Sequence, residues 1–327
     1  MSTVPAKSSS SGFSRSTGLA GVAIVLAALV AYYNSFSGPF IYDDVVSITE
    51  NPTIRHLWPV GRVLSPPAHL PVTGRPLLNL SLALNYALSG NAVWSYHALN
   101  LLIHILAGLT LFGLVRRTLL RQGNGGQALQ QPVLSKQFGE ASMPLAFAVA
   151  LLWVVHPLQT ECVTYVTQRA ESLMGLLYLL TLYCFVRGAE SARTLNAERR
   201  TPNAESPTTN YELPTTERRR LSDYSSSLWM LASVGACLLG MASKEVMVSA
   251  PLMVLLYDRT FVAGSFRAAW QNHWRLYLGL AVSWLLLGFL VASTGGNRNG
   301  SVASVGACDV AAVLSRGSAG TSTASPD

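Results

Sequence analysis

Long apolar runs separated by polar segments dominate the chain, and they predict helices that cross a membrane. The first run, from Gly18 to Phe36, has 19 residues, close to the roughly 20 that a helix needs to span a bilayer. Six further runs follow, so we expect a polytopic all-α bundle. The seven expected spans are residues 18–36, 96–115, 143–157, 170–187, 228–243, 246–257 and 276–293.

Two of these assignments have alternatives. The Ser-rich start followed by an apolar run is also typical of a signal peptide, but no clear cleavage pattern follows it, so we favour a retained span. The fifth and sixth spans are short and separated by Lys244-Glu245. A single helix through both would place Pro251, which lacks a backbone N–H, in its interior. We therefore expect a tight hairpin with the charged pair at its tip.

Charge supports a membrane protein and indicates its orientation. Charged residues make up 12% of the chain and the mean hydropathy is +0.33, whereas soluble domains carry about 25% charged residues. With the N-terminus in the cytoplasm, the inner segments hold 16 of the 23 Lys and Arg residues, as the positive-inside rule requires. Topology thus explains the net charge of +7, and we expect no nucleic acid partner.

The chain divides into three expected parts. Residues 1–17 are a cytoplasmic N-terminal tail and residues 18–293 form the transmembrane domain. Residues 294–327 are rich in Gly, Ser, Ala and Thr, which indicates a disordered tail or the product of a frameshift or early stop. The four cysteines show no paired spacing, so neither a disulfide framework nor a zinc site is predicted.

Polar residues gather on the side predicted to be extracytoplasmic. Asp43 and Asp44 directly follow the first span and begin a long loop that reaches about Ser95. Paired carboxylates at a membrane boundary can accept a proton, bind a metal or orient a polar substrate. The stretch Leu77–Leu88 alternates apolar and polar residues at roughly helical spacing, which predicts an amphipathic helix.

The second span carries a polar stripe. His97, Asn100 and His104 are three and four residues apart, so they share one helix face. Polar groups in a membrane face a bundle interior or a cavity. Hydrogen bonding between helices and lining of a substrate cavity are both open readings.

Two further charged segments lie on the same predicted side. The turn between the third and fourth spans holds Glu161, Arg169 and Glu171, and the hairpin tip holds Lys244 and Glu245. These groups could pair structurally or could line a substrate site.

Several motifs in order resemble the membrane part of the transmembrane-and-TPR O-mannosyltransferase family and its bacterial relatives. The segments are Phe40-Ile41-Tyr42-Asp43-Asp44, Asn51-Pro52-Thr53-Ile54-Arg55, Gly74-Arg75-Pro76-Leu77, Tyr96 to His104, His156 to Glu161, Gln168-Arg169-Ala170-Glu171 and Ser243-Lys244-Glu245. Each is weak alone, but the ordered set is fairly specific. Family members carry further spans and tetratricopeptide repeats, which do not follow residue 293 here, so a truncated and inactive product is one expectation.

The resemblance implies a GT-C-type glycosyltransferase with a long first extracytoplasmic loop. It would transfer a mannose-like sugar from a polyprenyl-phosphate carrier to a protein hydroxyl on the extracytoplasmic side of the lipid bilayer. Asp43 would be the general base, with Asp44 and Glu161 orienting the acceptor or a sugar hydroxyl. Cations would hold the leaving phosphate, and other polar groups would line the substrate cavity. The expected substrate-binding residues are Arg75, His97, Asn100, His104, Arg169, Glu171, Lys244 and Glu245.

Other readings stay open. A divalent cation such as Mg²⁺ or Mn²⁺ would suit carboxylate oxygens, but two adjacent side chains make an incomplete shell, and no metal ligand is assigned. A multi-pass transporter is the alternative from another class, and a non-catalytic scaffold is a third. The Ala-, Gly- and Leu-rich spans favour a bacterial inner membrane over the endoplasmic reticulum.

Overall fold

The computed structural model describes residues 10–123, 132–200 and 215–294, and within these ranges it is all-helical. Seven of the described helical segments are long and apolar enough to cross a membrane: Arg15–Ser37, Val93–Gln122, Lys136–Val154, Arg169–Arg193, Asp223–Met241, Glu245–Ala263 and Phe266–Ser293. The expected all-α polytopic bundle is confirmed, and the chain is an integral multi-pass membrane protein.

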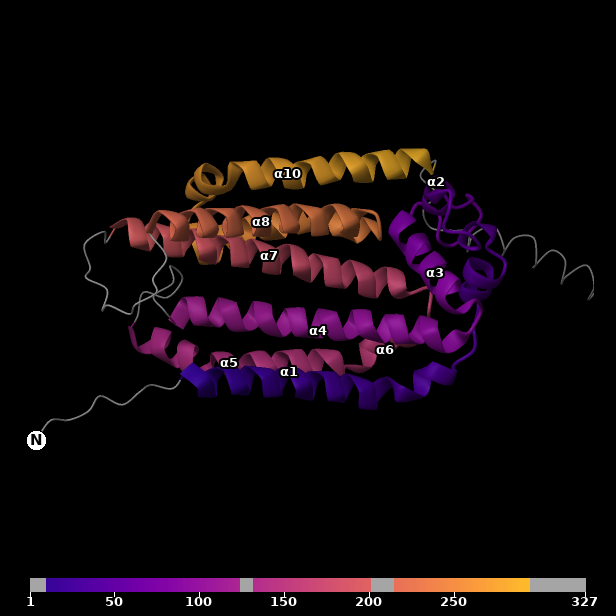
Figure 1. The fold of residues 1–327 in the computed structure, drawn as a ribbon, viewed down its shortest axis with the longest axis horizontal. Coiled ribbons are helices and arrows are strands. Elements are labelled where there is room, and N and C mark those ends of the chain that lie inside the picture. Colours follow the sequence, from indigo (N-terminus) through magenta and orange to yellow (C-terminus); the bar gives the residue numbers. More distant parts are fainter. Residues whose placement is uncertain (1–9, 124–131, 201–214, 295–327) are drawn as a thin grey trace, which may run out of the picture.

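The long helices lie side by side along one direction (Figure 1). They are α1 (Ser10–Tyr32), α4 (Val93–Gly123), α5 (Pro132–Val154), α7 (Arg169–Arg200), α8 (Thr215–Met241) and α10 (Phe266–Ser293). The short α9 (Ala250–Tyr257), with a short helix at each end, makes up the sixth span. Shorter helices are η1 (Tyr33–Ser37), η2 (Val45–Thr49), η3 (Pro52–Ile54), α2 (Val60–Leu64), α3 (Pro76–Ser89), η4 (Pro157–Gln159), α6 (Thr160–Thr164), η5 (Glu245–Ser249) and η6 (Asp258–Ala263).

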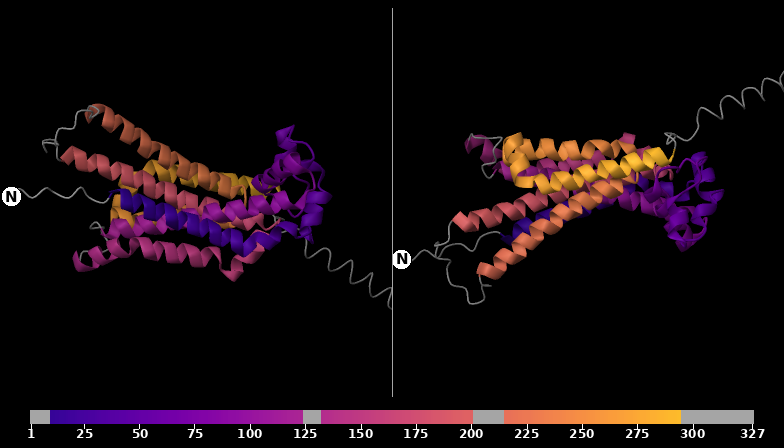
Figure 2. Two further views of the ribbon diagram at one scale, coloured as in Figure 1. Left: turned by 60° about the horizontal axis from the view of Figure 1, so that its bottom comes forward. Right: turned by 90° about the horizontal axis from the view of Figure 1, so that it is seen from above.

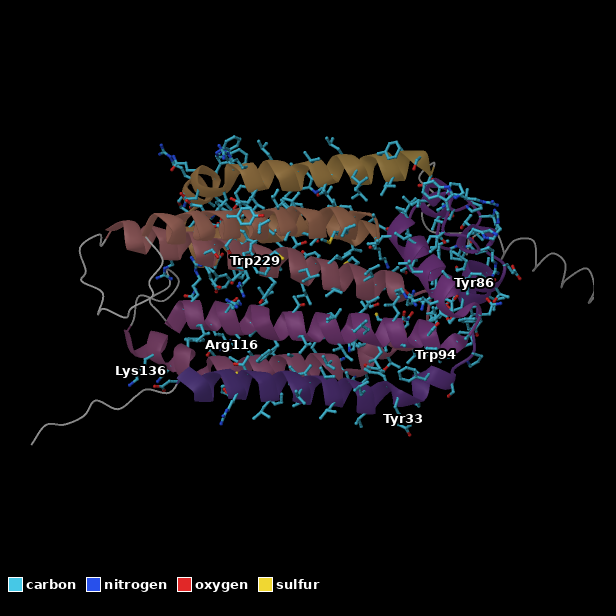
Figure 3. All side chains as sticks on the ribbon, viewed as in Figure 1. Tyr33, Tyr86, Trp94, Arg116, Lys136 and Trp229 are labelled. Carbon is cyan, nitrogen blue, oxygen red and sulfur yellow. The ribbon has the colours of Figure 1, made fainter. Side chains whose placement is uncertain are left out.

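Residues 38–92 form a cap over one end of the bundle, as both views of Figure 2 show. We call this the cap end and the opposite end the base end. In Figure 3, Tyr86 and Trp94 lie at the cap end, whereas Arg116 and Lys136 lie toward the base end. An apolar cluster joins the cap to the bundle, and it includes Ile48 and Leu78 of the cap and Tyr96 of α4.

Three apolar clusters of described residues hold the bundle together, and the smallest of them joins α4 to α7. The first joins α1, α4 and α5 and includes Ile24, Leu101 and Ala150. The second joins α7, α8, α9 and α10 and includes Phe185 and Met247. On the outside, large apolar side chains stay exposed, for example Val30 at 73% and Leu285 at 73%. Such a surface suits hydrocarbon rather than water.

The hairpin between the fifth and sixth spans forms as the sequence predicts. Helix α8 ends at Met241, Lys244 adopts an extended conformation, and η5 starts at Glu245. Pro251 lies at the start of α9, where its missing N–H has no intrahelical partner to lose. By contrast, the third span was expected over residues 143–157, but α5 already begins at Pro132 and has Pro144 in its interior, because a helix can continue past a single missing donor.

Helix α3 begins at Pro76 and ends before Gly90, whose φ of 59° lies in the left-handed region that glycine tolerates. The helix expected over 77–88 is therefore present. Its first N–H beyond the proline, from Leu77, donates to the carbonyl of Ala242 at 3.1 Å. This bond joins the segment around Arg75 to the hairpin that carries Lys244.

Candidate functional site

The cap end brings together charged residues from five separate segments of the chain. Asp43 and Asp44 follow η1, Arg75 precedes α3, Glu161 lies in α6, Glu171 lies in the first turn of α7, and Lys244 with Glu245 form the hairpin tip. Because the helices alternate in direction, the loops after odd-numbered spans all meet at this end.

Asp44 is buried, with 1% of its surface exposed. Its Oδ1 accepts hydrogen bonds from the Thr167 backbone N–H at 2.7 Å and from the Thr167 hydroxyl at 2.5 Å. Burial raises the pKa of Asp44, and the hydrogen bonds from Thr167 partly offset this effect. Asp44 thus fixes the first loop to the segment before α7.

Asp43 is exposed. Its backbone N–H donates to the Tyr165 hydroxyl at 3.1 Å. The preceding residue, Tyr42, has a φ of 45°, a conformation that is unfavourable for a bulky side chain. The strained turn and the anchored Asp44 together hold the Asp43 carboxylate outward at the cap end.

Lys244 is the centre of the second half of the site. Its ammonium pairs with Glu171. Burial lowers the pKa of Lys244, and the nearby positive charge of Arg75 lowers it further, while Glu245, Cys162 and Glu161 act in the opposite sense. The lysine therefore lies among the hairpin tip, α6 and the start of α3.

Two atoms beside Lys244 lack hydrogen-bond partners. Arg75 Nε and Glu245 Oε2 are buried without one, although Arg75 Nη1 donates to the Pro71 carbonyl at 3.4 Å. A buried polar atom without a partner costs about 1–3 kcal/mol. Arg75 thus has a donor that a bound oxygen could satisfy.

Glu161 lies between the groups around Asp43 and those around Lys244. It is exposed on α6. Burial is the largest cause of the raised pKa of Tyr165, and the charges of Asp43, Asp44 and Glu161 add to it. The pKa of Cys162 is raised chiefly by burial, then by Glu161, with Lys244 opposing. A continuous set of interacting groups therefore runs from Asp43 to Arg75.

Arg169 has a different environment from the one expected of a phosphate ligand. It is fully buried, and its Nε donates to Asn100 Oδ1 at 2.6 Å. Its Nη1 donates to the Ser81 hydroxyl at 3.2 Å and its Nη2 to the Tyr96 carbonyl at 3.0 Å. The guanidinium therefore joins α7, α4 and α3, and its hydrogen-bonding fork is already occupied by protein groups.

The polar stripe of α4 is also engaged with backbone carbonyls. His97 Nε2 donates to Gly38 at 3.1 Å, and His104 Nε2 donates to Val154 at 2.8 Å. The Asn100 amide reaches the Val163 carbonyl at 3.3 Å. All three side chains are buried. The three side chains of the stripe therefore connect α4 to the first loop, to α5 and to the segment before α7.

Metal binding has limited support. Within the described ranges, no group of three or more His, Cys, Asp and Glu side chains is placed to hold a metal ion. Oδ1 of Asp44 already accepts two hydrogen bonds from Thr167. Cys162, Cys184 and Cys237 are free thiols, and Cys308 lies outside the described residues.

Sequence reasoning missed three residues that shape the site: Tyr42, Tyr165 and Thr167. The last two lie within the polar segment between the third and fourth spans, but only the fold shows that this segment contacts Asp43 and Asp44. The residue pair joined by the Asp44–Thr167 bond is separated by 123 positions.

Comparison with known proteins points to one group of enzymes. The chain is 33% identical over 176 residues to Protein O-mannosyl-transferase Tmtc3 of Drosophila melanogaster, covering 50% of this chain and 18% of that protein. It is 32% identical over 183 residues to Protein O-mannosyl-transferase TMTC1 of Mus musculus, covering 52% and 17%. Protein O-mannosyl-transferase F38B6.6 of Caenorhabditis elegans is 28% identical over 188 residues, covering 54% and 24%.

These matches confirm the resemblance to the transmembrane-and-TPR O-mannosyltransferases over about half of the chain. The matched region covers less than a quarter of the length of these three relatives. No protein-family model matches the chain, and no solved structure matches it significantly.

Proposed function

We propose that this chain is the membrane part of a GT-C-type glycosyltransferase that transfers a sugar from a polyprenyl-phosphate carrier to a protein hydroxyl. The relatives are named protein O-mannosyl-transferases, which supports a mannose-like sugar and a protein acceptor. The observation that carries the proposal is the arrangement at the cap end, where an exposed carboxylate on an anchored loop lies at the same end of the bundle as two cations.

Asp43 is the general base of this proposal. The acceptor hydroxyl oxygen attacks the anomeric carbon, the bond between that carbon and the carrier phosphate oxygen breaks, and the hydroxyl proton passes to the Asp43 carboxylate. Asp43 is exposed to an incoming acceptor, whereas the adjacent Asp44 is buried and bound to Thr167. General base catalysis of this kind typically contributes about 10²- to 10⁴-fold in rate.

Arg75 and Lys244 are the proposed ligands of the leaving phosphate. Negative charge develops on the phosphate as the glycosidic bond breaks, and cations fixed nearby stabilise it. Arg75 Nε has no protein partner, and the neighbouring Lys244 is held in place by Glu171. Glu161 and Glu245 would bind sugar or acceptor hydroxyls at the edges of the same site.

Four expected ligands take a supporting part. His97, Asn100 and His104 lie below the site on α4, and Arg169 lies beside them with all three of its nitrogen groups bonded. We propose that they set the position of the loops rather than contact the sugar. A substrate cavity between them would require these hydrogen bonds to open.

Asp43→Asn tests the proposal, with Glu50→Gln as the matched control because Glu50 is another exposed carboxylate of the first loop. Full-chain protein in sealed vesicles would receive a polyprenyl-phosphate-mannose donor and a Ser/Thr-containing peptide. We expect Asp43→Asn to lower transfer by about 10²-fold or more, and Glu50→Gln to retain it. Full activity of Asp43→Asn would contradict the base, and solute uptake without transfer would favour a transporter.

The proposed function also bears on which membrane holds the protein. The bacterial inner membrane favoured by span composition finds no support among the three relatives above, which are animal proteins. We therefore propose a membrane facing a compartment that supplies lipid-linked sugars, either the endoplasmic reticulum or a bacterial inner membrane. Fractionation of the source cells would distinguish the two.

A further inference from the structure

The base end carries a cluster of arginines that the proposed transfer reaction does not use. Arg116, Arg117 and Arg121 lie in the last turns of α4, and Arg187 and Arg193 lie on the neighbouring α7. Arg116 is visible toward this end in Figure 3. We call these five residues the base cluster.

Aromatic side chains and one carboxylate hold parts of the base cluster in place. The Arg187 guanidinium lies 4.6 Å from the centre of the Trp229 ring, and that of Arg117 lies 5.6 Å from the Tyr183 ring. Arg117 also pairs with Glu190. These contacts hold the Arg117 and Arg187 guanidinium groups where α4 and α7 lie side by side.

Asp258, a carboxylate near Arg121, already has other partners. Its Oδ2 accepts hydrogen bonds from His273 at 2.7 Å and from the Tyr277 hydroxyl at 2.5 Å. Asp258 is fully buried, and its Oδ1 has no hydrogen-bond partner. A polar group that enters this region would therefore meet an acceptor as well as the arginines.

Helix α4 presents further unpartnered atoms at the same junction. Thr118 bonds the Tyr257 hydroxyl at 2.6 Å, and Arg121 Nε donates to the Phe261 carbonyl at 2.8 Å, so this face of α4 contacts α9 and η6. Arg121 Nη1 is buried without a partner. Gln122, one turn beyond Thr118, is 4% exposed, and neither its Nε2 nor its Oε1 has a partner.

These unpartnered atoms fit one kind of ligand. Arg121 Nη1 and Gln122 Nε2 are donors for phosphate oxygens, whereas Gln122 Oε1 and Asp258 Oδ1 are acceptors for hydroxyl groups. Basic pockets between membrane helices on the cytoplasmic side bind phosphate-containing lipid headgroups. Surface arginines alone would follow from the positive-inside rule, but buried atoms without partners would not.

We propose that the base cluster, with Gln122 and Asp258, binds the headgroup of an anionic phospholipid that carries hydroxyl groups, as phosphatidylglycerol and phosphatidylinositol do. The phosphodiester contacts Arg121 and Gln122, and the headgroup hydroxyls donate to Asp258. The lipid tails extend along α4 and η6 into the bilayer. The site lies at the end of the bundle opposite Asp43 and is independent of the proposed transfer reaction.

The test measures lipid binding to the purified full chain. The readout is the rise of the unfolding midpoint, because a ligand that binds only the folded state stabilises it. The probes are phosphatidylglycerol, phosphatidylcholine, inorganic phosphate and phosphatidylmethanol, which has the same charge as phosphatidylglycerol but no headgroup hydroxyl. We expect phosphatidylglycerol to bind most tightly and phosphatidylmethanol about fivefold more weakly, as the loss of one hydrogen bond predicts. Equal effects of the three lipids, or an equal effect of inorganic phosphate, would overturn the proposal.

Two variants locate the site. Arg121→Gln should weaken phosphatidylglycerol binding about tenfold, whereas Arg267→Gln, an exposed arginine at the same end with the same charge change, should not. Gln122→Met removes two unpartnered atoms, so it should raise the lipid-free unfolding midpoint and still weaken lipid binding. Wild-type affinity in both Arg121→Gln and Gln122→Met would contradict the assignment.

Discussion

Asp43 and Asp44 are adjacent, but they have opposite environments. The Asp44 carboxylate is enclosed by the Thr167 backbone and side chain, whereas Asp43 is exposed. A pair that looks equivalent in sequence therefore divides into one anchoring residue and one residue open to a substrate.

The burial of Asp44 makes the stability of the fold depend on pH, and this dependence can be measured. Because its pKa is raised in the folded state, folding favours the protonated form. The stabilising contribution is fully present below the ordinary aspartate pKa of about 4 and is lost as the pH rises through the raised folded pKa. We expect the unfolding midpoint of wild type, relative to Asp44→Asn, to fall over this window.

Asp44→Asn keeps an Oδ1 that can accept from Thr167, so the loop should stay attached while the titration disappears. Asp43→Asn has the same change in charge and serves as the control for effects of net charge. A difference between wild type and Asp44→Asn that does not vary with pH would show that Asp44 does not titrate in this range.

Arg169 and Arg75 provide a second prediction at the residue scale. Arg169→Gln should lower the free energy of unfolding by about 3 kcal/mol, because it breaks bonds to three buried partners. Arg75→Gln should change it by less than about 1 kcal/mol and should lower sugar transfer about 10²-fold. Chemical unfolding and transfer assays would measure both effects. If Arg169→Gln lost transfer activity without losing stability, Arg169 would be a phosphate ligand and not a supporting residue.

The sequence predicted which residues gather at one membrane face, but it did not separate those that hold the fold from those that remain open. Charge counting and span order place Asp43, Glu161, Arg169 and Lys244 together, because alternate loops share a side. Whether the N–H donors of an arginine are free to bind a ligand depends on partners in other helices, such as Asn100 and Ser81 for Arg169. No local pattern encodes that pairing.

At the scale of elements, the packing of α4 against α5 depends on a glycine. A Cβ added at Gly108 would lie 2.3 Å from Val154 Cγ2. The Val154 carbonyl also accepts bonds from His104 and from the Tyr32 hydroxyl, so α1, α4 and α5 meet at this point. The close approach of helices at small residues is a common basis of membrane helix packing.

Gly108→Ala should therefore destabilise the bundle by about 1–3 kcal/mol, the usual cost of overpacking. Gly175→Ala is the control, because a Cβ at Gly175 on α7 meets nothing within 4 Å; it should be neutral or stabilise by up to about 1 kcal/mol. Gly108→Ala combined with Val154→Ala should recover part of the loss. Equal unfolding midpoints for the two single alanine variants would contradict this packing.

Elements whose boundaries depend on local chemistry were easier to predict than those that depend on tertiary contacts. Pro251 indicated the hairpin at Lys244-Glu245, and the spacing within 77–88 indicated α3. The extension of α5 before Pro144 was not expected, since that segment is polar and a proline is more often found near a helix start. The short helix α6 likewise gave no periodic signal over its five residues.

At the scale of the whole molecule, the seven described spans place the cap and the base cluster on opposite sides of the membrane. The positive-inside rule then predicts that the cap, with Asp43, lies outside the cytoplasm. Both proposals depend on this orientation. The sugar donor must reach Asp43 from the extracytoplasmic leaflet, and the anionic lipid must reach Arg121 from the cytoplasmic one.

Site-directed labelling tests the orientation directly. In a background where all four cysteines are replaced by alanine, Glu50→Cys reports on the cap and Arg267→Cys on the base end, and both positions are exposed. In sealed vesicles with the extracytoplasmic face outward, a membrane-impermeant maleimide should label Glu50→Cys at once and Arg267→Cys only after detergent is added. The reverse pattern would place Asp43 in the cytoplasm, where the proposed base would face a nucleotide-sugar pool instead of a lipid-linked donor. Labelling of both positions in intact vesicles would mean that the chain does not cross the membrane an odd number of times between them.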